Sequence, residues 1–514
     1  MSKTIIIIGA GLAGLSAALQ AAENGCNVKL VSSLPSERAQ SVMAEGGINA
    51  ALNTKDENDS PEEHFTDTIK AACGLADPNA VWGMTQAAPE LVHWLLELGV
   101  QFNMSGYDDV DLRNFGGQKK KRTAFAQSDT GKQIMTAMID AVRRKEASGM
   151  VERFSHHSFL TLRLCDNICC GCVIRDEYSQ ETVELPGDAV IVATGGMHGS
   201  FGNTTGSLSN TGEVTAELFR LGVPLANGEM IQYHPTTVKC GGKRMLISEA
   251  ARGEGGRLFA MKDGKQWYFM EEKYPELGNL MPRDITAREI WKVSHESEVF
   301  LDMTEISEEI ISNKLSGLAE DCMTYLHKDI RKEPVSVLPG IHYFMGGILV
   351  DEQHRTPIQN LYAAGECCAQ YHGANRLGGN SLLGALYGGR VAAKSACEQA
   401  DVVDLSCATQ IDFPPASQIS EIKQLNKVMQ ETMGVVRNEN TLLNGIQTVQ
   451  ALTGNLPLLG MAVLKSALAR KESRGAHWRE DYPKSNDDDY LKTTVARFDG
   501  KQIQISFVPV PERR

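Results

Sequence analysis

The stretch that most constrains the fold is a glycine-rich turn near the N-terminus. Residues 5–8 are four consecutive isoleucines, a pattern typical of a parallel strand that is buried on both faces. The sequence GAGLAG follows at once over positions 9–14, and it leads into an Ala- and Leu-rich stretch, Leu15–Glu23, that predicts a helix. A second strand is expected over Asn27–Val31. A GxGxxG motif in this strand–turn–helix–strand setting predicts a dinucleotide-binding fold, because the free N–H groups at the helix start can bind a pyrophosphate. The candidate phosphate-binding residues are Gly9, Ala10, Gly11, Leu12, Ala13 and Gly14.

The residue that would hold the ribose is less evident. In dinucleotide-binding folds an acidic residue about 20 positions past the glycines usually accepts hydrogen bonds from the ribose hydroxyls. Here the second strand ends in Ser32 and Ser33, and the next acid is Glu37, beyond Pro35. We therefore expect the usual acidic ribose contact to be missing or displaced.

Two later segments also run from a predicted strand into glycine. Asp188–Val192 leads to Thr194 and Gly195, and 361–364 leads to Gly365 and Glu366. These two later strand-to-glycine segments imply that the dinucleotide domain is discontinuous, with parts at 1–227 and 340–400. An α+β capping domain would be inserted between them at 228–339. The predicted fold class is therefore α/β, with a Rossmann-like first domain.

The segment beyond Ala400 has a different pattern. Leu and Met recur at helical spacings, with charged residues between them, over 418–433, 441–452 and 456–471. The sequence therefore predicts a C-terminal helical domain over 401–514.

Charge and cysteine usage narrow the class of function. The net charge of 51 − 64 = −13 disfavours nucleic-acid binding, which needs clustered Lys and Arg. Apolar runs fall short of the roughly 18 to 20 residues that span a bilayer, and the start of the chain has no signal-peptide layout, so a cytoplasmic protein with reduced thiols is expected. The one local group of cysteines, at 165, 169, 170 and 172, lacks the spacing of a metal or iron–sulfur site and is typical of a β-hairpin, so no metal site is predicted.

Four polar clusters on the later part of the chain suggest chemistry. They are 234–236 (His-Pro-Thr), 248–256 (SEAARGEGG), 282–284 (Pro-Arg-Asp), and His342 together with Arg376. Converging Arg and His side chains suit an anionic substrate with two carboxylates, since Arg offers a permanent charge and two parallel donors. A salt-bridged domain interface would use the same residue types, and spacing alone leaves both readings open.

Taken together, these motifs resemble the flavoprotein subunit of the fumarate reductase and succinate dehydrogenase family, which is close to L-aspartate oxidase. The resemblance runs nearly from end to end. It is carried by the glycine turn, the four clusters, and six further stretches: AEGG at 44–47, FGG at 115–117, Arg122-Thr123, HYFMGG at 342–347, NRLGGNSL at 375–382 and SRGAH at 473–477.

The resemblance implies FAD as cofactor and gives the residues roles. His234 and Ser248 would bind one carboxylate of fumarate, with Ser248 standing where the family usually has Thr. His342 and Arg376 would bind the other, and Phe125 would lie over the substrate. Reduced FAD would pass hydride from N5 to one alkene carbon, and Arg283 would protonate the other carbon. The remaining candidate cofactor-binding residues are Ser32, Ser33, Ser41, Glu45, Gly46, Gly47, Thr194, Gly195, Glu213, Glu366, Ser381 and Leu382.

The proton would reach Arg283 through Glu249 and Arg252. An arginine is a weak acid, so it can donate only transiently, to a strongly basic carbon, and must be re-protonated quickly. Glu249 and Arg252 are three residues apart and share one face of a helix, which suits a relay and equally suits a structural ion pair.

Two departures from the family bear on the direction of the reaction. Members with covalent flavin carry a His where this chain has Gln40, which has no ring nitrogen to bond the flavin, so FAD is expected to be non-covalent and its potential lower. Glu45 stands where succinate dehydrogenases usually have Gln, and a carboxylate there would oppose an anionic reduced flavin. Both departures favour fumarate reduction.

Three alternatives remain: succinate dehydrogenase, L-aspartate oxidase and a non-catalytic flavin-binding electron carrier. The oxidase usually has an acidic residue at the position of Phe115, which cannot pair with an ammonium group. The chain has no iron–sulfur or haem motif of its own, so electrons must come from outside. In the family the donor is an iron–sulfur subunit docked to a membrane anchor, which would place the protein at the inner face of the cytoplasmic membrane, although some relatives use soluble donors.

Overall fold

A five-stranded parallel sheet forms the centre of the molecule. The computed structural model describes residues 2–106, 109–401, 411, 413 and 418–514. The sheet has the order β20-β10-β1-β2-β6, and neighbouring strands run parallel. Its strands are β1 (Thr4–Ile8), β2 (Asn27–Ser32), β6 (Val151–Ser155), β10 (Ala189–Val192) and β20 (Leu361–Ala363). Each strand and glycine return that the sequence predicts is present, including the two late ones.

Successive isoleucines of β1 point to opposite faces of this sheet, so each face contributes to a different hydrophobic core. Ile5 and Ile7 pack into a core with the helices, whereas Ile6 and Ile8 pack into a second core with a smaller antiparallel sheet. That smaller sheet consists of β7 (His157–Cys165), β8 (Ile168–Asp176) and β9 (Thr182–Pro186). The hairpin expected around the clustered cysteines is confirmed as β7–β8, and Cys169, Cys170 and Cys172 lie buried in it.

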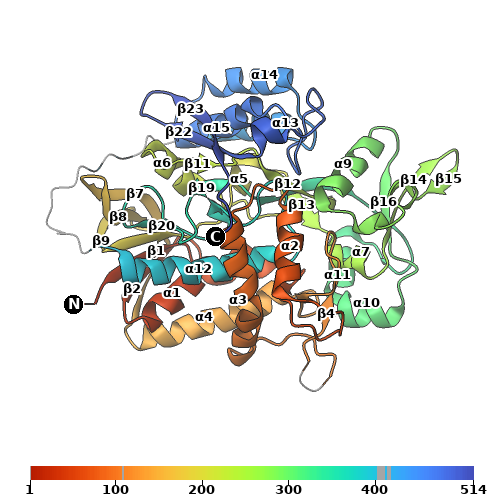
Figure 1. Cartoon of the computed structure of the whole chain (residues 1–514), viewed down its shortest axis with the longest axis horizontal. Helices are drawn as coiled ribbons and strands as arrows, with labels where there is room; N and C mark the ends of the chain where they lie inside the picture. The colour runs from red at the N-terminus through yellow and green to blue at the C-terminus, as the bar shows by residue number, and fades with distance from the viewer. Residues whose placement is uncertain (1, 107–108, 402–410, 412, 414–417) are drawn as a thin grey trace.

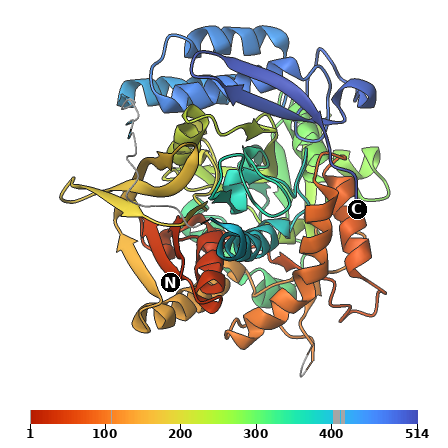
Figure 2. The ribbon, with the colours of Figure 1, turned by 60° about the vertical axis from the view of Figure 1, so that its left-hand side comes forward.

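Helices cover the other face. They are α1 (Leu12–Glu23), α4 (Thr130–Ala147) and α12 (Asn380–Gln399), and α2 (Pro61–Ala71) and α3 (Pro78–Glu97) pack beside them, with α3 against α12. Figures 1 and 2 both show α12 lying alongside α1, although more than 350 residues separate them in sequence. Short pieces complete this part of the chain: β3 (Ile48–Asn49), β4 (Leu112–Arg113), β5 (Thr123–Ala124), α5 (His198–Phe201), α6 (Glu213–Arg220) and β11 (Leu225–Ala226).

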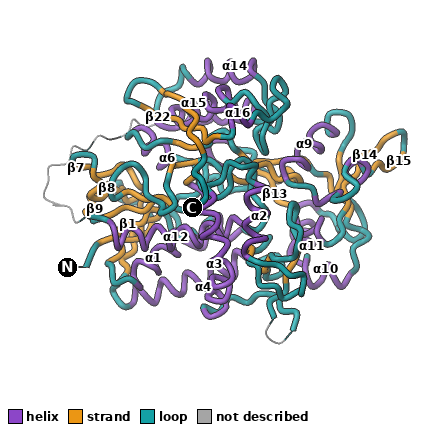
Figure 3. Tube along the Cα trace, viewed as in Figure 1, coloured by secondary structure: helices purple, strands orange, loops and turns teal. Residues whose placement is uncertain are grey.

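The inserted capping region is mixed α and β, as Figure 3 shows on the side away from the central sheet. One of its sheets has the order β13-β12-β18 and the other β15-β14-β16-β17. The predicted boundary at 339 falls inside β18, which continues into the second part of the dinucleotide domain. The elements are β12 (Ile231–Cys240), β13 (Lys243–Leu246), α7 (Glu249–Gly253), β14 (Arg257–Lys262), β15 (Lys265–Trp267), α8 (Phe269–Lys273), α9 (Arg283–Val293), β16 (Val299–Asp302), α10 (Glu308–Lys314), α11 (Ser316–Asp321), β17 (Val335–Ser336) and β18 (Leu338–Phe344).

The C-terminal region contains the expected helices and one unexpected hairpin. Its helices are α13 (Ile419–Thr432), α14 (Glu439–Val449), α15 (Asn455–Ala469) and α16 (Asp487–Tyr490), while most of the first residues of the predicted domain lie outside the described ranges. The strands β22 (Lys492–Phe498) and β23 (Ile503–Pro509) join β11, β19 (Gly347–Leu349) and β21 (Cys368–Ala369) in one sheet. The dipeptide Asp499-Gly500, a strong turn signal, could have revealed this hairpin. The fold class is otherwise as predicted.

Candidate active site

A cavity of about 320 Å³ runs from the glycine turn after β1 to the capping region. Predicted cofactor residues line most of its length, and predicted substrate residues line its inner end. The cofactor part is lined by Gly9, Ala10, Gly11, Leu12, Ala13, Ser32, Ser33, Gln40, Ser41, Glu45, Gly46, Gly47, Thr194, Gly195, Glu213, Glu366, Ser381 and Leu382. The substrate part is lined by His234, Ser248, Glu249, Arg283, His342 and Arg376.

The glycine turn is built so that backbone can approach a ligand closely. Gly9 has φ +110°, and a Cβ there would lie 2.3 Å from the Ala193 carbonyl oxygen. Gly14 does not line the cavity, because it packs against the turn, where a Cβ would lie 1.8 Å from the Gly9 oxygen. The helix α1 starts at the cavity wall with Gly11 as its N-cap, which offers no side chain, and the Leu12 N–H donates to the Ser41 hydroxyl at 3.2 Å. This end of the cavity therefore fits a pyrophosphate.

Polar atoms that lack a partner face the rest of the cofactor part. The Ser32 hydroxyl and the Glu45 Oε2 atom are buried without a hydrogen bond, so both are free to bind a ligand. Glu37 does not line the cavity, because its carboxylate pairs with Arg143 on the surface at 2.6 Å. At the end of β2, where the ribose-binding acid of such folds usually stands, the cavity is lined by Ser32 and Ser33 instead.

Glu45 differs from its expected state. Burial raises the pKa of this carboxyl group to about 8, with a further contribution from Asp321, while Arg113 opposes the shift. Because the pKa is raised, the neutral, protonated form persists up to about pH 8. The predicted repulsion between a Glu45 carboxylate and reduced flavin is therefore wrong at neutral pH, since the group carries little charge there.

At the inner end, three charged residues form a continuous chain. Arg283 donates to Glu249 Oε2 through Nε at 2.8 Å and Nη2 at 2.6 Å, and Arg252 donates to Glu249 Oε1 at 3.1 Å. Burial alone would raise the pKa of Glu249, but the two guanidinium groups outweigh it and hold the pKa below the ordinary value. Arg283 and Glu249 line the cavity, whereas Arg252 lies behind Glu249 and does not. A proton relay from Arg252 through Glu249 to Arg283 requires this order.

The two histidines that line the inner end are neutral imidazoles. Burial lowers the pKa of His234 and of His342 well below 6.5, and nearby guanidinium groups lower both further. The rings lie 5.1 Å apart, and His234 Nε2 is buried without a partner. Burial also lowers the pKa of Arg376, to about 9, so this side chain remains cationic at neutral pH. The site thus offers two neutral imidazoles and two guanidinium groups.

Phe125 lies outside this cavity. Its ring packs against the guanidinium of Arg113 at 3.9 Å, whereas Phe115 lines the wall and contacts Gly46. No local pattern in the sequence distinguishes these two phenylalanines, so only the packing shows that Phe115, and not Phe125, lines the cavity.

Two further residues hold the site together and were missed. Gln232 accepts from Arg283 at 3.2 Å and donates to the Arg376 carbonyl at 2.8 Å, so it links two guanidinium-bearing segments. The Thr205 hydroxyl lies 2.8 Å from His342 Nδ1, leaving Nε2 of that ring for the cavity. Gln232 could have been predicted, because it lies two residues before His234 and side chains at i and i+2 of a strand point to the same face. No such signal pointed to Thr205.

Two family profiles match most of the chain. The profile of the FAD binding domain matches residues 4–382, and that of the fumarate reductase flavoprotein C-terminal region matches 452–513. The succinate dehydrogenase flavoprotein subunit of Bacillus subtilis is 38% identical, covering 100% of this chain and 98% of its own length. The chain belongs to the succinate dehydrogenase and fumarate reductase flavoprotein family. It is accordingly an FAD-dependent oxidoreductase acting on CH–CH groups.

Other members of this flavoprotein family are similar over their whole length. The 8-methylmenaquinol:fumarate reductase flavoprotein subunit of Wolinella succinogenes is 32% identical, covering 100% of this chain and 92% of its own. Among solved structures, the quinol fumarate reductase of E. coli has a TM-score of 0.89 at 27% identity, covering 99% of this flavoprotein and 97% of that chain. Within the described residues, no helix is both long and apolar enough to cross a bilayer.

Proposed function

We propose that this flavoprotein is a fumarate reductase with non-covalently bound FAD. The observation that carries the proposal is the chain Arg252–Glu249–Arg283, which ends at a cavity wall shared with two neutral histidines and Arg376. When bound, FAD supplies the hydride for the alkene carbon. The protein residues bind and orient the dicarboxylate and deliver a proton.

The two carboxylates would be held at opposite ends. His234 and the Ser248 hydroxyl would donate to one carboxylate, and His342 and Arg376 to the other. Thr205 is compatible with this assignment: its hydroxyl lies 2.8 Å from His342 Nδ1 and would donate to that atom in the tautomer that carries its N–H on Nε2, the form that can donate to the substrate. Buried donors of this kind are strongest when they bind a charged group.

Arg283 would give its proton to the second alkene carbon. Glu249, held as a carboxylate between two guanidinium groups, would pass a proton from Arg252 to restore it. The alternative reading, a purely structural ion-pair network, predicts the same contacts but no effect on the rate of proton transfer.

Succinate oxidation is the second candidate, since it is the same reaction reversed and the Bacillus subtilis relative is named a succinate dehydrogenase subunit. L-Aspartate oxidation is disfavoured by Phe115, which is buried at the wall where an acid would have to pair with the substrate amine. Turnover with reduced viologen separates the candidates. A fumarate reductase consumes fumarate, the oxidase also consumes aspartate, and a mere electron carrier consumes neither.

The electron donor belongs to the proposal as well. Relatives are named as subunits, which supports a partner protein for this chain. We propose an iron–sulfur subunit that is itself bound to a membrane anchor, at the inner face of the cytoplasmic membrane. Co-purification of the intact complex from its native membranes, followed by iron analysis, tests this; a flavoprotein recovered alone and fully active with a soluble donor contradicts it.

The first prediction concerns the attachment of FAD. Gln40 lines the cavity at the position where a covalent linkage would need a ring nitrogen. Acid precipitation is therefore expected to release all of the flavin into the supernatant, and a denaturing gel is expected to show no fluorescent protein band. A fluorescent band at the mass of this chain would contradict non-covalent binding.

The second prediction concerns direction. Fumarate reduction is expected to exceed succinate oxidation by at least about tenfold at neutral pH and matched driving force, a difference of roughly 1.4 kcal/mol in barrier. The reason is the lower potential expected for a non-covalent flavin. Equal rates in the two directions would reject the assignment.

The Glu45→Gln variant tests whether the charge of Glu45 affects the flavin potential. Since the raised pKa of Glu45 keeps it neutral below about pH 8, the variant should match the wild type at pH 6.5. Above pH 8 the wild-type carboxylate becomes charged, so the flavin potential of the wild type should fall below that of the variant. Spectroelectrochemical titration at both pH values measures this. If the flavin potential of the wild type lies below that of the variant by the same amount at both pH values, Glu45 is ionised at both.

A further inference from the structure

Two thiols that are distant in sequence meet behind the cofactor cavity. The Sγ atoms of Cys26 and Cys397 lie 2.8 Å apart. Cys26 is 5% exposed and Cys397 is half-buried, so a small reagent can reach the pair from the Cys397 side. The Lys3 ammonium donates to the Cys397 carbonyl at 2.8 Å and fixes the end of the helix there.

The position of the pair connects it to the cavity. Cys26 lies between the end of α1 and the start of β2, and Cys397 lies in the last turn of α12. Leu12, the first residue of α1, and Leu382, in the first turn of α12, line the cofactor part of the cavity. The two thiols therefore join the far ends of two helices whose near ends form the FAD-binding wall.

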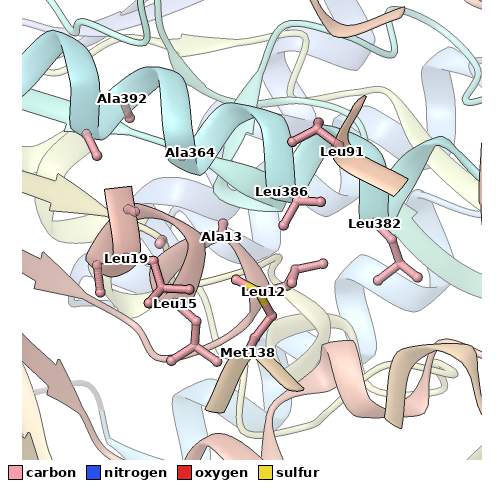
Figure 4. Packing of buried hydrophobic residues seen from close by; sticks show 14 of the residues in the cluster. Leu12, Ala13, Leu15, Leu19, Leu91, Met138, Ala364, Leu382, Leu386 and Ala392 are labelled. Atoms are coloured by element: carbon pink, nitrogen blue, oxygen red, sulfur yellow. The ribbon is translucent and has the colours of Figure 1, made fainter. Parts of the chain in front are cut away.

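The two helices are also in close contact along their length. The Ser16 hydroxyl donates to the Leu386 carbonyl at 2.7 Å, and a Cβ on Gly389 would lie 2.3 Å from the Ala13 carbonyl oxygen. Figure 4 shows Ala13 of α1 and Leu386 of α12 where the two helices meet, while Leu15 of α1 lies on the side of Met138 of α4. A covalent link at the far ends would thus tie together a helix pair that is already packed tightly.

We propose that Cys26 and Cys397 form a reversible dithiol–disulfide site, oxidised by low-molecular-weight disulfides, and that the disulfide form retains FAD more firmly. The Sγ atoms need to approach by only about 0.8 Å to reach bonding distance, which small rotations of the two side chains can provide. The inference is independent of the direction of catalysis proposed above.

The chemistry is a balanced thiol–disulfide exchange. The Cys397 thiolate, the more accessible of the two, attacks one sulfur of the small disulfide and releases one small thiol. The Cys26 sulfur then attacks the mixed disulfide at Cys397, so that the Cys26–Cys397 bond forms and the second small thiol leaves. Two protein thiols are oxidised, one small disulfide is reduced to two thiols, and the two thiol protons pass to the leaving groups.

The rate of this exchange is expected to depend on pH. Burial, together with the contact to Cys26, raises the pKa of Cys397 above its ordinary value, and the nearby Lys3 opposes the shift. The thiolate is therefore scarce at neutral pH and increases as the pH rises, so exchange should be slow at pH 7 and faster at pH 9.

The test uses the FAD-loaded protein and oxidised glutathione as the probe. After incubation at pH 7 and pH 9, free thiols are alkylated and the digest is searched for a Cys26–Cys397 linked peptide that dithiothreitol removes. Cys26→Ser and Cys397→Ser should each abolish it. Cys240→Ser, which removes a half-buried cysteine with no sulfur contact in the described part of the chain, should leave it intact. Absence of the linked peptide in the wild type, or a stable glutathione adduct on Cys397, would overturn the proposal.

The second readout is the temperature at which FAD is released on heating, measured by the increase in flavin fluorescence. The oxidised wild type should release FAD at a higher temperature than the reduced wild type, whereas the Cys26→Ser and Cys397→Ser proteins should show no difference between oxidising and reducing conditions. This comparison is made within each protein, so a general loss of stability in a variant does not affect it. An unchanged release temperature in a fully linked wild type would overturn the effect on FAD.

Discussion

Replacing Arg283 by alanine is expected to slow the oxidation of reduced flavin by fumarate by about 10² to 10⁴-fold, the usual contribution of a positioned acid. The geometry behind this is the contact of Arg283 with Glu249 at 2.6 Å and its position on the cavity wall. Fumarate affinity should change less than turnover, because a proton-transfer role appears mainly in kcat. Single-turnover flavin oxidation, with binding titrated separately on the oxidised enzyme, measures both.

Two variants make this result specific. Arg283→Lys keeps the charge but shortens the reach, so partial activity would favour proton donation over simple charge pairing. Arg257→Ala removes another capping-domain arginine that pairs with a glutamate, Glu271 at 2.6 Å, but lies outside the cavity, and it should leave turnover unchanged. Near-wild-type flavin oxidation in Arg283→Ala would remove Arg283 as the acid.

Replacing Arg376 by alanine is expected to weaken fumarate binding by roughly 1.5 to 3 kcal/mol, the value of a charge-assisted hydrogen bond. Turnover should fall as well, since a substrate held at one end only loses its reactive geometry. The Arg376 guanidinium stacks on Tyr343 at 4.3 Å, and no carboxylate within the described ranges forms a salt bridge with it. Equilibrium titration of fumarate on the oxidised enzyme gives the binding loss.

The thermal midpoint distinguishes this role from a structural one. A buried cation without an acidic partner is costly, so its removal should not lower the midpoint of the substrate-free protein. Arg355→Ala, which removes an exposed arginine that pairs with Asp351 in the same part of the chain, serves as the matched control and should leave binding intact. A large drop in stability in Arg376→Ala with unchanged fumarate affinity would show that the side chain serves the packing of the fold and does not bind substrate.

Much of the fold was accessible from local patterns. The isoleucine run, the glycines at 9–14 and the helix after them specify a strand, a turn and an open helix end, because each depends on residues within about 20 positions. The same holds for the glycine returns at Gly195 and Gly365. The hairpin β22–β23 had an equally local signal in Asp499-Gly500 that the helical pattern of the preceding segment obscured.

Residue type and spacing were enough to predict the dinucleotide turn, an inserted domain and a set of candidate His and Arg residues. How distant segments pack was needed to show that Phe115 and not Phe125 lines the cavity, that burial raises the pKa of Glu45, and that Cys26 lies against Cys397. The physical reason is that burial, pKa and contact depend on which distant segments pack together. The two thiols, for example, are 371 residues apart in the sequence. Their contact depends on the topology of the whole chain, and no local pattern specifies it.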